Sequence, residues 1–376
     1  MVNLPRFCVI VGANGTGKST LFEVFDFLQD ALMGNVNTAL FNLSGGRGFQ
    51  EVRSRSSTGP IELTLRFREK PGKPLKTYFL QINETDGKAY VEREILRYRK
   101  GDHGRPEHIL DFSNGSGTVV SNDTGSADGG SVGETLKTKL KSPDILAIRG
   151  FSQFKMFPTI VALGNLIENR HVSGSHFKRT HPEEHGEDAD FLSGERKNLT
   201  LAIQYLHQHH PKNLETIFRQ LGRLIPGTRV ETKSSEEGPV LLKIQEGIVK
   251  DSCSAQHASD ATLKMLSFLI VLYTPQPYPL LCVAEPENHF YPQSRRRLAE
   301  ELRNYSKRSG QIIVTTHSPD ILNAATADDV FWLEKNDGYT TIVRACEDQK
   351  IVNYTTEGAQ MGDLWKQGFF GGIDPN

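Results

Sequence analysis

The chain has 376 residues, of which 37% are hydrophobic and 24% are charged, so wholesale disorder is excluded and one large α/β domain with an inserted lobe is expected. The net charge is −1, which excludes a general attraction to DNA or to anionic membranes; DNA binding is possible only through a local patch. No apolar run approaches the ~18 residues of a membrane span, the N-terminus does not resemble a signal peptide, and the four cysteines are widely spaced. We therefore expect a cytoplasmic protein without a membrane partner.

The N-terminal segment predicts a strand, a glycine-rich loop and a helix. Residues 7–11 (FCVIV) form an apolar run typical of a buried strand, and GANGTGKS at 12–19 fits the phosphate-loop pattern GxxxxGK[ST] in full. We expect the backbone N–H groups of this loop to surround a β-phosphate, Lys18 to reach the β- and γ-phosphate oxygens, and Ser19 to ligate Mg²⁺. The predicted cofactors are ATP and Mg²⁺, and the predicted nucleotide-binding residues are Gly12, Asn14, Gly15, Thr16, Gly17, Lys18, Ser19 and Thr20.

The middle of the chain changes character along its length. Residues 60–67 alternate strictly between apolar and polar side chains, which predicts a half-buried antiparallel strand, and 77–82 and 89–98 read as further strands of that sheet. Residues 113–133 are nearly all Gly, Ser, Asn, Asp and Thr, which predicts a surface loop. Apolar residues at helical spacing then predict two helices, one with apolar positions over 199–206 and one with apolar positions over 214–224, separated at Pro211.

Two buried strands near the C-terminal end are each followed by a polar side chain. The apolar run LLCVA at 280–284 leads to Glu285, and a carboxylate at a strand end can orient an attacking water. The run IIVTT at 312–316 leads to His317, which would emerge where a γ-phosphate could be contacted. We expect Glu285 and His317 to be the catalytic residues.

Ser259 and Asp260 stand immediately before an apolar helix pattern. A serine in this place is typical of a helix N-cap, and the same geometry presents a hydroxyl and free N–H groups to an anion. Both interpretations remain open from the residues alone.

The order of these motifs resembles that of the ABC-type ATPases of the RecF, OLD (overcoming-lysogenization-defect) and structural-maintenance-of-chromosomes group. The resemblance is closer to the small bacterial AAA ATPases of that group, which are often encoded beside nuclease-like genes in anti-phage loci. The matching segments, which span 7–67 and 245–345, are GANGTGKST as Walker A, ASDATL as the signature, AEPENHFYP as Walker B and TTHSP as the switch histidine.

The resemblance implies a P-loop NTPase of the α/β class: an ABC-ATPase-like head with a mixed central sheet, an antiparallel flank and an inserted helical lobe. The predicted divisions are 1–100 for the N-terminal part of the ATPase head, 101–240 for a lobe of flexible loops and helices, and 241–376 for the C-terminal part and tail. It also implies a homodimer or higher oligomer, in which Ser259 and Asp260 act in trans on the γ-phosphate bound to another chain. Gln153 is the candidate for a second Mg²⁺ ligand beside Ser19; the alternative is an ordinary polar loop residue.

The resemblance further implies an ATPase whose ATP-driven dimerisation regulates a separate effector, a nuclease or a toxin, in anti-phage defence. Two departures bear on this function: Ala284 stands where the family has Asp or Glu, and Ala261 replaces the signature glycine. Weak hydrolysis is therefore expected. Two alternatives remain, a RecF-like DNA-repair clamp that binds duplex DNA and a nucleotide-binding scaffold with little catalysis.

Overall fold

The chain forms two compact units, which we call the first unit (Met1–Ser19 and His171–Asn376) and the second unit (Thr20–Arg170). The computed structural model describes residues 2–54, 57–70, 72–99, 106–121, 133–173, 191–233, 241–247, 253–254, 258–336 and 338–370. Of these, residues 172–173, 191–198, 233, 241 and 253–254 are described by their backbone alone.

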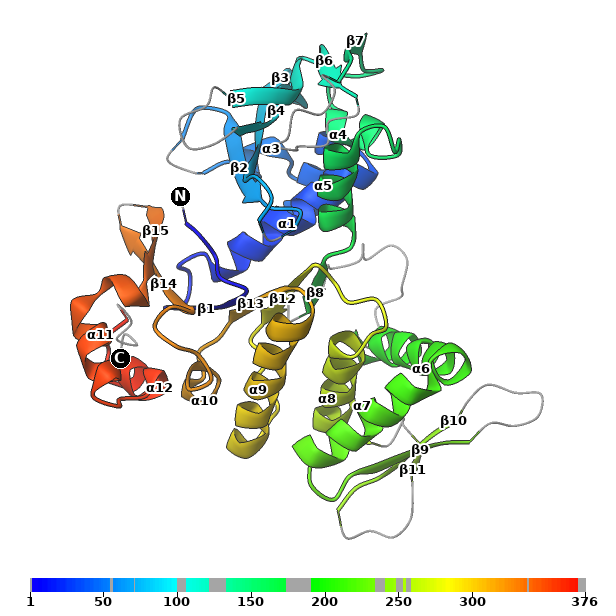
Figure 1. Ribbon diagram of the computed structural model, residues 1–376, viewed down its shortest axis with the longest axis vertical. Coiled ribbons are helices and arrows are strands. Elements are labelled where there is room, and N and C mark those ends of the chain that lie inside the picture. Colours follow the sequence, from blue (N-terminus) through cyan, green and yellow to red (C-terminus); the bar gives the residue numbers. More distant parts are fainter. Residues whose placement is uncertain are drawn as a thin grey trace. The chain divides into compact units, whose positions relative to one another are not determined.

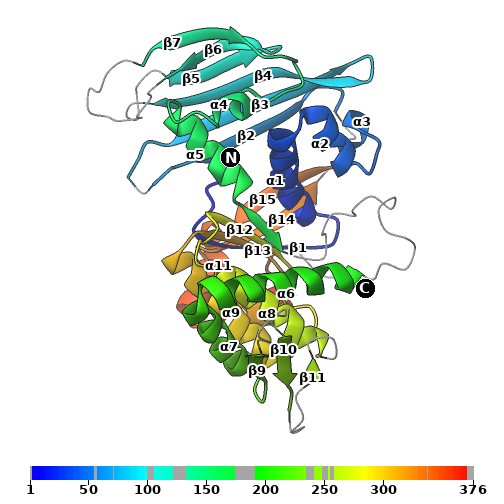
Figure 2. The ribbon, with the colours of Figure 1, turned by 90° about the vertical axis from the view of Figure 1, so that its right-hand side faces the viewer.

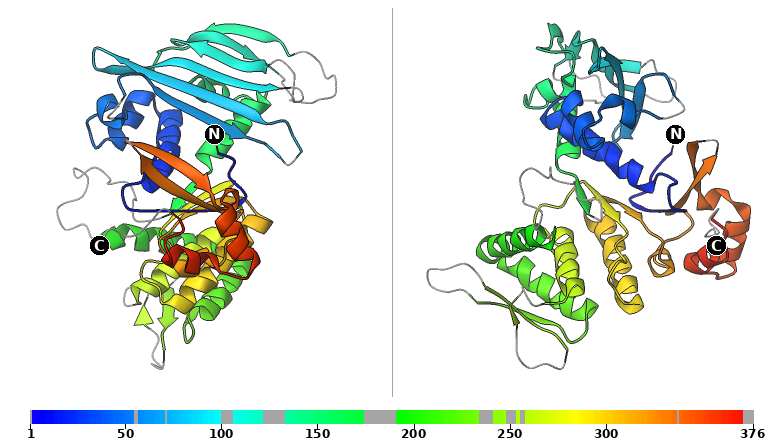
Figure 3. Two further views of the ribbon diagram at one scale, coloured as in Figure 1. Left: turned by 90° about the vertical axis from the view of Figure 1, so that its left-hand side faces the viewer. Right: turned by 180° about the vertical axis from the view of Figure 1, so that it is seen from behind.

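A mixed six-stranded sheet forms the centre of the first unit (Figure 1). Its strand order is β15 (Tyr339–Arg344), β14 (Val330–Asn336), β1 (Phe7–Gly12), β13 (Gln311–Thr315), β12 (Leu280–Ala284) and β8 (His171–Ser173). All neighbours pair in parallel except β14 and β15, which form a hairpin (Figure 3). β1 is buried along its whole length, as its continuous apolar sequence predicts for a parallel strand covered on both faces.

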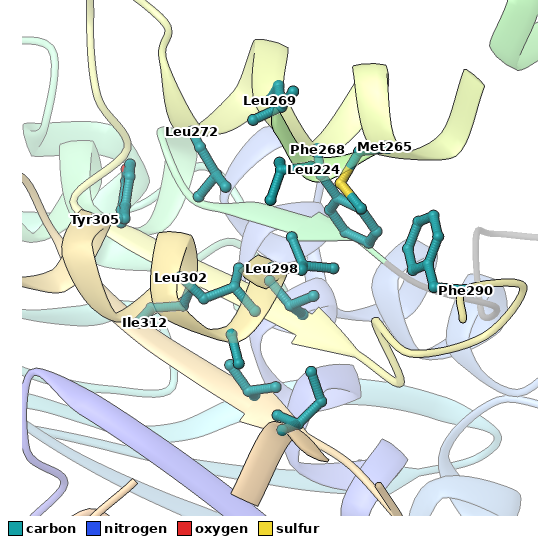
Figure 4. Packing of buried hydrophobic residues seen from close by; sticks show 14 of the residues in the cluster. Leu224, Met265, Phe268, Leu269, Leu272, Phe290, Leu298, Leu302, Tyr305 and Ile312 are labelled. Carbon is teal, nitrogen blue, oxygen red and sulfur yellow. The ribbon is translucent and has the colours of Figure 1, made fainter. Parts of the chain in front are cut away.

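Helices pack on one face of this sheet and supply most of the first unit's core (Figures 1 and 4). Buried Leu269 of α8 (Asp260–Leu272) and Leu302 of α9 (Pro292–Arg308) belong to this core. The remaining helices are α6 (Phe191–His209), α7 (Pro211–Leu224), α10 (Pro319–Leu322), α11 (Gln349–Thr356), α12 (Met361–Lys366) and the 3₁₀ helix η2 (Ala345–Glu347). A small antiparallel sheet contains β9 (Arg229–Lys233), β10 (Leu241–Gln245) and β11 (Cys253–Ser254). Among the described residues, no helix combines the length and apolarity of a membrane span.

The second unit is built on an antiparallel sheet whose six strands follow one another in chain order (Figure 2). The strands are β2 (Ile61–Phe67), β3 (Lys76–Thr85), β4 (Lys88–Arg99), β5 (Pro106–Ser113), β6 (Ser116–Val120) and β7 (Thr135–Lys139). The core of this unit also takes side chains from α1 (Lys18–Met33), which begins at the end of the phosphate loop, and from α2 (Val36–Leu43), α3 (Phe49–Val52), α4 (Ala147–Phe151) and α5 (Pro158–Glu168).

The predicted fold class is confirmed, but the chain divides differently from the predicted boundaries. The boundary at residue 100 separates β4 from β5, and the boundary at residue 240 separates β9 from β10, although each of these pairs is hydrogen-bonded. The region predicted as a loop at 113–133 contains β6, while 122–132 lies outside the described residues. The short sequence of β6, SGTVV, stands within a Gly- and Ser-rich stretch and gives little sign of a strand; its pairing with β5 and β7 stabilises it as one.

We predict that Leu302→Ala destabilises the first unit by about 2–5 kcal/mol, because it leaves a cavity in a close-packed core. Both tryptophans, Trp332 and Trp365, lie in the first unit, so tryptophan fluorescence during urea unfolding reports on this unit. The control is Glu300→Ala, at an exposed position of the same helix, which should change stability by less than about 0.5 kcal/mol. Equal unfolding midpoints for the two variants would contradict the assignment of Leu302 to the core.

Candidate functional site

The phosphate loop joins the end of β1 to the start of α1, and two of its glycines are required sterically. A Cβ at Gly12 would lie 2.9 Å from the carbonyl oxygen of Leu333, a backbone atom that cannot move aside easily. Gly17 has a φ of +98°, and a Cβ there would lie 3.2 Å from Thr340 Oγ1. Glycine is therefore the residue that these close approaches and this backbone conformation favour.

Lys18 is held inside the loop that precedes it. Its Nζ donates hydrogen bonds to the carbonyl oxygens of Gly12 at 2.8 Å and Ala13 at 2.9 Å, and the residue is 7% exposed. Burial lowers the pKa of Lys18, and the negative charge of Glu285 opposes that shift. The ammonium group is thus held against the loop's carbonyl oxygens, within electrostatic reach of the predicted catalytic carboxylate.

The hairpin of β14 and β15 braces the loop from outside the motif. Thr340 Oγ1 donates to the carbonyl oxygen of Thr16 at 2.8 Å, and Thr16 Oγ1 donates to the carbonyl oxygen of Ala13 at 2.8 Å. The sequence pattern does not reveal Thr340, because a residue more than 300 positions away carries no local signal of this contact.

Glu285 and His317 follow two neighbouring parallel strands, and the structure brings them together. The backbone N–H of Glu285 donates to the Thr315 carbonyl oxygen at 2.8 Å, which extends the ladder between β12 and β13 by one residue. Glu285 Oε1 lies 4.0 Å from His317 Nε2, and the two side chains are 36% and 37% exposed. Asn288 Nδ2 donates to Glu285 Oε2 at 3.1 Å and orients the carboxylate.

The backbone of Glu285 is strained. Its φ is +46°, which is uncommon for a residue with a side chain. Residues with such strained backbone conformations occur preferentially at functional sites. The predicted motif AEPENHF also contains Asn288 and the buried carboxylate of Glu287, but their roles could not be assigned without the fold.

Ser259 is the N-cap of α8, as the sequence predicts, and it already binds an anion of its own chain. Ser259 Oγ accepts from the Thr262 N–H at 3.2 Å and lies 2.8 Å from Glu246 Oε1, to which it donates. The Ser259 N–H also faces the Glu246 carboxylate, with N···O distances of 3.2 and 3.3 Å. Asp260 is the exposed first residue of α8.

The other predicted site residues have these places. Asn14 and Gly15 lie exposed in the loop, and Ser19 is the second residue of α1. Thr20, the next residue of α1, and Gln153, an exposed residue just after α4, belong to the second unit. The assignments of Thr20 to the nucleotide and of Gln153 to the metal stay predictions.

The residues present fit ATP well and Mg²⁺ in part. The loop's N–H groups stand at the start of a 16-residue helix beside a positioned lysine, which suits phosphate. Mg²⁺ prefers oxygen ligands, which Ser19 and Glu285 could supply, whereas Ala284 ends β12 without one. Within the part of the chain that is described, no group of three or more His, Cys, Asp or Glu could hold a metal ion. Phosphate oxygens of the nucleotide and water molecules would complete the metal's coordination.

The sequence profile of one protein family, "AAA domain, putative AbiEii toxin, Type IV TA system", matches residues 7–129 and 249–323, more than half of the chain. The search of curated proteins found no match to this chain.

Three similar solved structures are head domains of Smc proteins. An SmcHead bound to the C-winged helix domain of ScpA has 19% identity and a TM-score of 0.43, with 91% of each chain covered. An Smc head with an extended coiled coil, bound to the C-terminal domain of ScpA and derived from Pyrococcus furiosus, has 16% identity and a TM-score of 0.46, with 94% of each chain covered. The SMC head from Thermotoga maritima has 12% identity and a TM-score of 0.41, with 91% of this chain and 92% of that chain covered.

We predict that Lys18→Ala weakens ATP binding at least about 100-fold, because a hydrogen bond to a charged group contributes ~1.5–3 kcal/mol and Lys18 can make more than one. Isothermal titration calorimetry measures the change. Lys350→Ala removes an exposed lysine of α11 and is the matched control, which should bind ATP like the parent. Parental affinity in the Lys18 variant would remove the basis for the phosphate-loop assignment.

Proposed function

The chain belongs to the family described as "AAA domain, putative AbiEii toxin, Type IV TA system", and on that premise we propose that it binds ATP·Mg²⁺ and hydrolyses ATP slowly. In this proposal, ATP-driven association of two chains regulates an effector. One observation carries the proposal. Lys18 follows β1, Glu285 follows β12 and His317 follows β13, so a cation, a carboxylate and an imidazole lie at the carboxyl edge of adjacent parallel strands. This is the edge at which open α/β sheets bind ligands.

Each side chain has a separate task in this proposal. Lys18 neutralises charge on the β- and γ-phosphates, and Glu285, oriented by Asn288, accepts a hydrogen bond from the attacking water. His317 donates to the γ-phosphate. Magnesium, when bound, would neutralise phosphate charge, and Ser19 would hold it. Ala284 leaves the metal without the usual strand-end carboxylate, which is the reason that we expect slow turnover.

The start of α8 supports a role for Ser259 at the γ-phosphate of a second chain. The Ser259 hydroxyl and N–H already donate to the Glu246 carboxylate, so the geometry suits an anion with accepting oxygens. A γ-phosphate would make the same kind of contact in place of Glu246. ADP lacks that group, so ATP alone would join two chains through this contact.

The family's description, "putative AbiEii toxin, Type IV TA system", supports a link between this chain and a toxin system. We propose that the chain is its ATP-dependent regulator and that the nuclease or toxin is a separate protein, in bacterial anti-phage defence. A second candidate function is a nucleotide-binding scaffold with little catalysis, which Ala284 favours. Turnover measurements distinguish the two.

We predict that the parent hydrolyses ATP slowly, that Glu285→Gln lowers kcat about 100-fold or more, and that Ala284→Asp raises it about tenfold. The first change removes the group that orients the water, and the second restores an acid beside the metal. Phosphate release under single-turnover conditions measures both. Fast turnover that ignores both substitutions would contradict these roles, and no turnover in the parent would favour the scaffold.

We predict that chains associate in ATP and remain apart in ADP, and that Ser259→Arg blocks association through its bulk while ATP binding to the single chain is retained. Light scattering gives the mass, and calorimetry gives the affinity. Asp363→Arg places the same side chain at an exposed position of α12 and is the matched control. If the mass is the same with ATP, with ADP and in the Ser259 variant, the trans contact is wrong or other surfaces hold the chains together. A disulfide between Ser259→Cys of one chain and a cysteine in its partner's phosphate loop separates these two explanations.

A further inference from the structure

Glu287 is a buried carboxylate two residues beyond Glu285. It is 7% exposed, and its Oε1 accepts two hydrogen bonds, from Thr316 Oγ1 at 2.7 Å and from the backbone N–H of His317 at 2.8 Å. One oxygen atom therefore joins the loop after β12 to the segment after β13. We call residues Thr316, His317 and Ser318 the switch segment.

The switch segment is tied at further points, and Thr316 is the residue common to most of them. The Thr316 N–H donates to the Ile10 carbonyl oxygen of β1 at 3.1 Å, and the Ser318 N–H donates to Thr316 Oγ1 at 2.9 Å. A continuous chain of hydrogen bonds thus runs from Ser318 through the Thr316 hydroxyl to Glu287. It fixes the backbone of His317 against both β1 and the loop that carries Glu285.

Stability alone gives a poor reason for a carboxylate here. Glu287 Oε2 is buried, and it has no hydrogen-bond partner among the described residues. A carboxylate that is buried and only half satisfied costs free energy, so an apolar side chain would suit a purely structural position better. The two bonds that Glu287 does make both go to the switch segment.

We propose that Glu287 is a positioning residue for ATP hydrolysis: it holds the backbone of His317 so that the imidazole and the Glu285 carboxylate address the same γ-phosphate and attacking water. This inference rests on the proposed function. In this proposal, the hydrogen bonds that Glu287 accepts maintain the 4.0 Å distance between Glu285 Oε1 and His317 Nε2. Displacing a catalytic group by about 1 Å can lower a rate about 100-fold. The hydrogen bond from the His317 N–H to Glu287 is therefore sufficient to control turnover, although Glu287 itself does not touch the nucleotide in this proposal.

The test compares Glu287→Ala and Glu287→Gln. The alanine variant loses the accepting oxygen, so kcat should fall about 10- to 100-fold while the Kd for ATP changes less than about threefold, since Lys18 and the loop are untouched. The glutamine variant keeps an accepting oxygen without the charge, so it should recover most of the loss, to within about threefold of the parent. If Gln is as damaging as Ala, the charge itself is used, as a metal ligand or proton acceptor, and the positioning role is overturned.

Thr316→Val tests the same connection from the other side, with nearly the same side-chain volume. It removes the hydroxyl bridge between Ser318 and Glu287 but leaves the hydrogen bond from the His317 N–H to Glu287, so it should lower kcat by less than Glu287→Ala does. The double variant should be little worse than Glu287→Ala, which already removes the bond that the two side chains share. Additive losses would overturn the proposal. The matched control is Glu301→Ala, which removes another buried carboxylate of the first unit, one that accepts from Tyr273 OH at 2.7 Å. It should leave kcat of the folded protein unchanged.

Hydrogen exchange measures the positioning without turnover. Exchange at residues 316–318 should rise in Glu287→Ala and Thr316→Val and stay at the parental level in Glu301→Ala. Glu285→Gln distinguishes failure of this inference from failure of the proposed function. If Glu285→Gln lowers turnover but Glu287→Ala does not, only the inference fails. If the parent shows no turnover that depends on Glu285, the proposed function fails and the positioning of a catalytic pair fails with it, whatever the exchange result.

Discussion

The parallel pairing of β13 with β1 on one side and β12 on the other is the constraint on which the rest of the site depends. Ile10 lies opposite Thr315, and Thr315 lies opposite Ala284, so β12 and β13 end at one level and β1 runs two residues further, to Gly12. Because side chains alternate between the two faces, a slip of one residue in either pairing would turn every side chain of the slipped strand to the other face. The same register holds the phosphate loop, Glu285 and His317 at a common edge of the sheet. The relative positions of these groups therefore depend on the hydrogen bonds between the three strands.

The parts of the site that could be predicted are those whose chemistry is local. GANGTGKS contains the glycines of its turn, its lysine and the start of the following helix. The apolar runs before Glu285 and His317 predict buried strands. Thr340 and Glu246 could not be predicted, because their partners lie 324 and 13 positions away and only the fold brings them into contact. The division of the chain into its two units could not be predicted either, because the composition changes near residue 100 whereas strand pairing continues from β4 to β5.

Ala284 separates binding from chemistry. The residue is 8% exposed at the end of β12, and the ladder with β13 runs through its backbone atoms, so a methyl group keeps the strand, the turn into Glu285 and the loop geometry intact. What the methyl group lacks is an oxygen that could ligate the proposed Mg²⁺. The features proposed to hold phosphate, Lys18 and the N–H groups of the loop, lie between the end of β1 and the start of α1 and do not involve this position.

The pairing of β1 also determines the order in which the chain can acquire its structure during synthesis. The second unit is a continuous stretch whose strands pair with their immediate neighbours, so its contacts are available as soon as residues 20–170 have left the ribosome. β1 is made before β13 and β14, with which it pairs, so Phe7 meets Ile312 only after about 300 further residues have been added. β1 therefore stays unpaired until β13 has been made, and the phosphate loop at its end takes shape only after that. A truncated chain that ends before β13 would therefore contain the complete phosphate-binding motif and yet lack the strands that form its binding site.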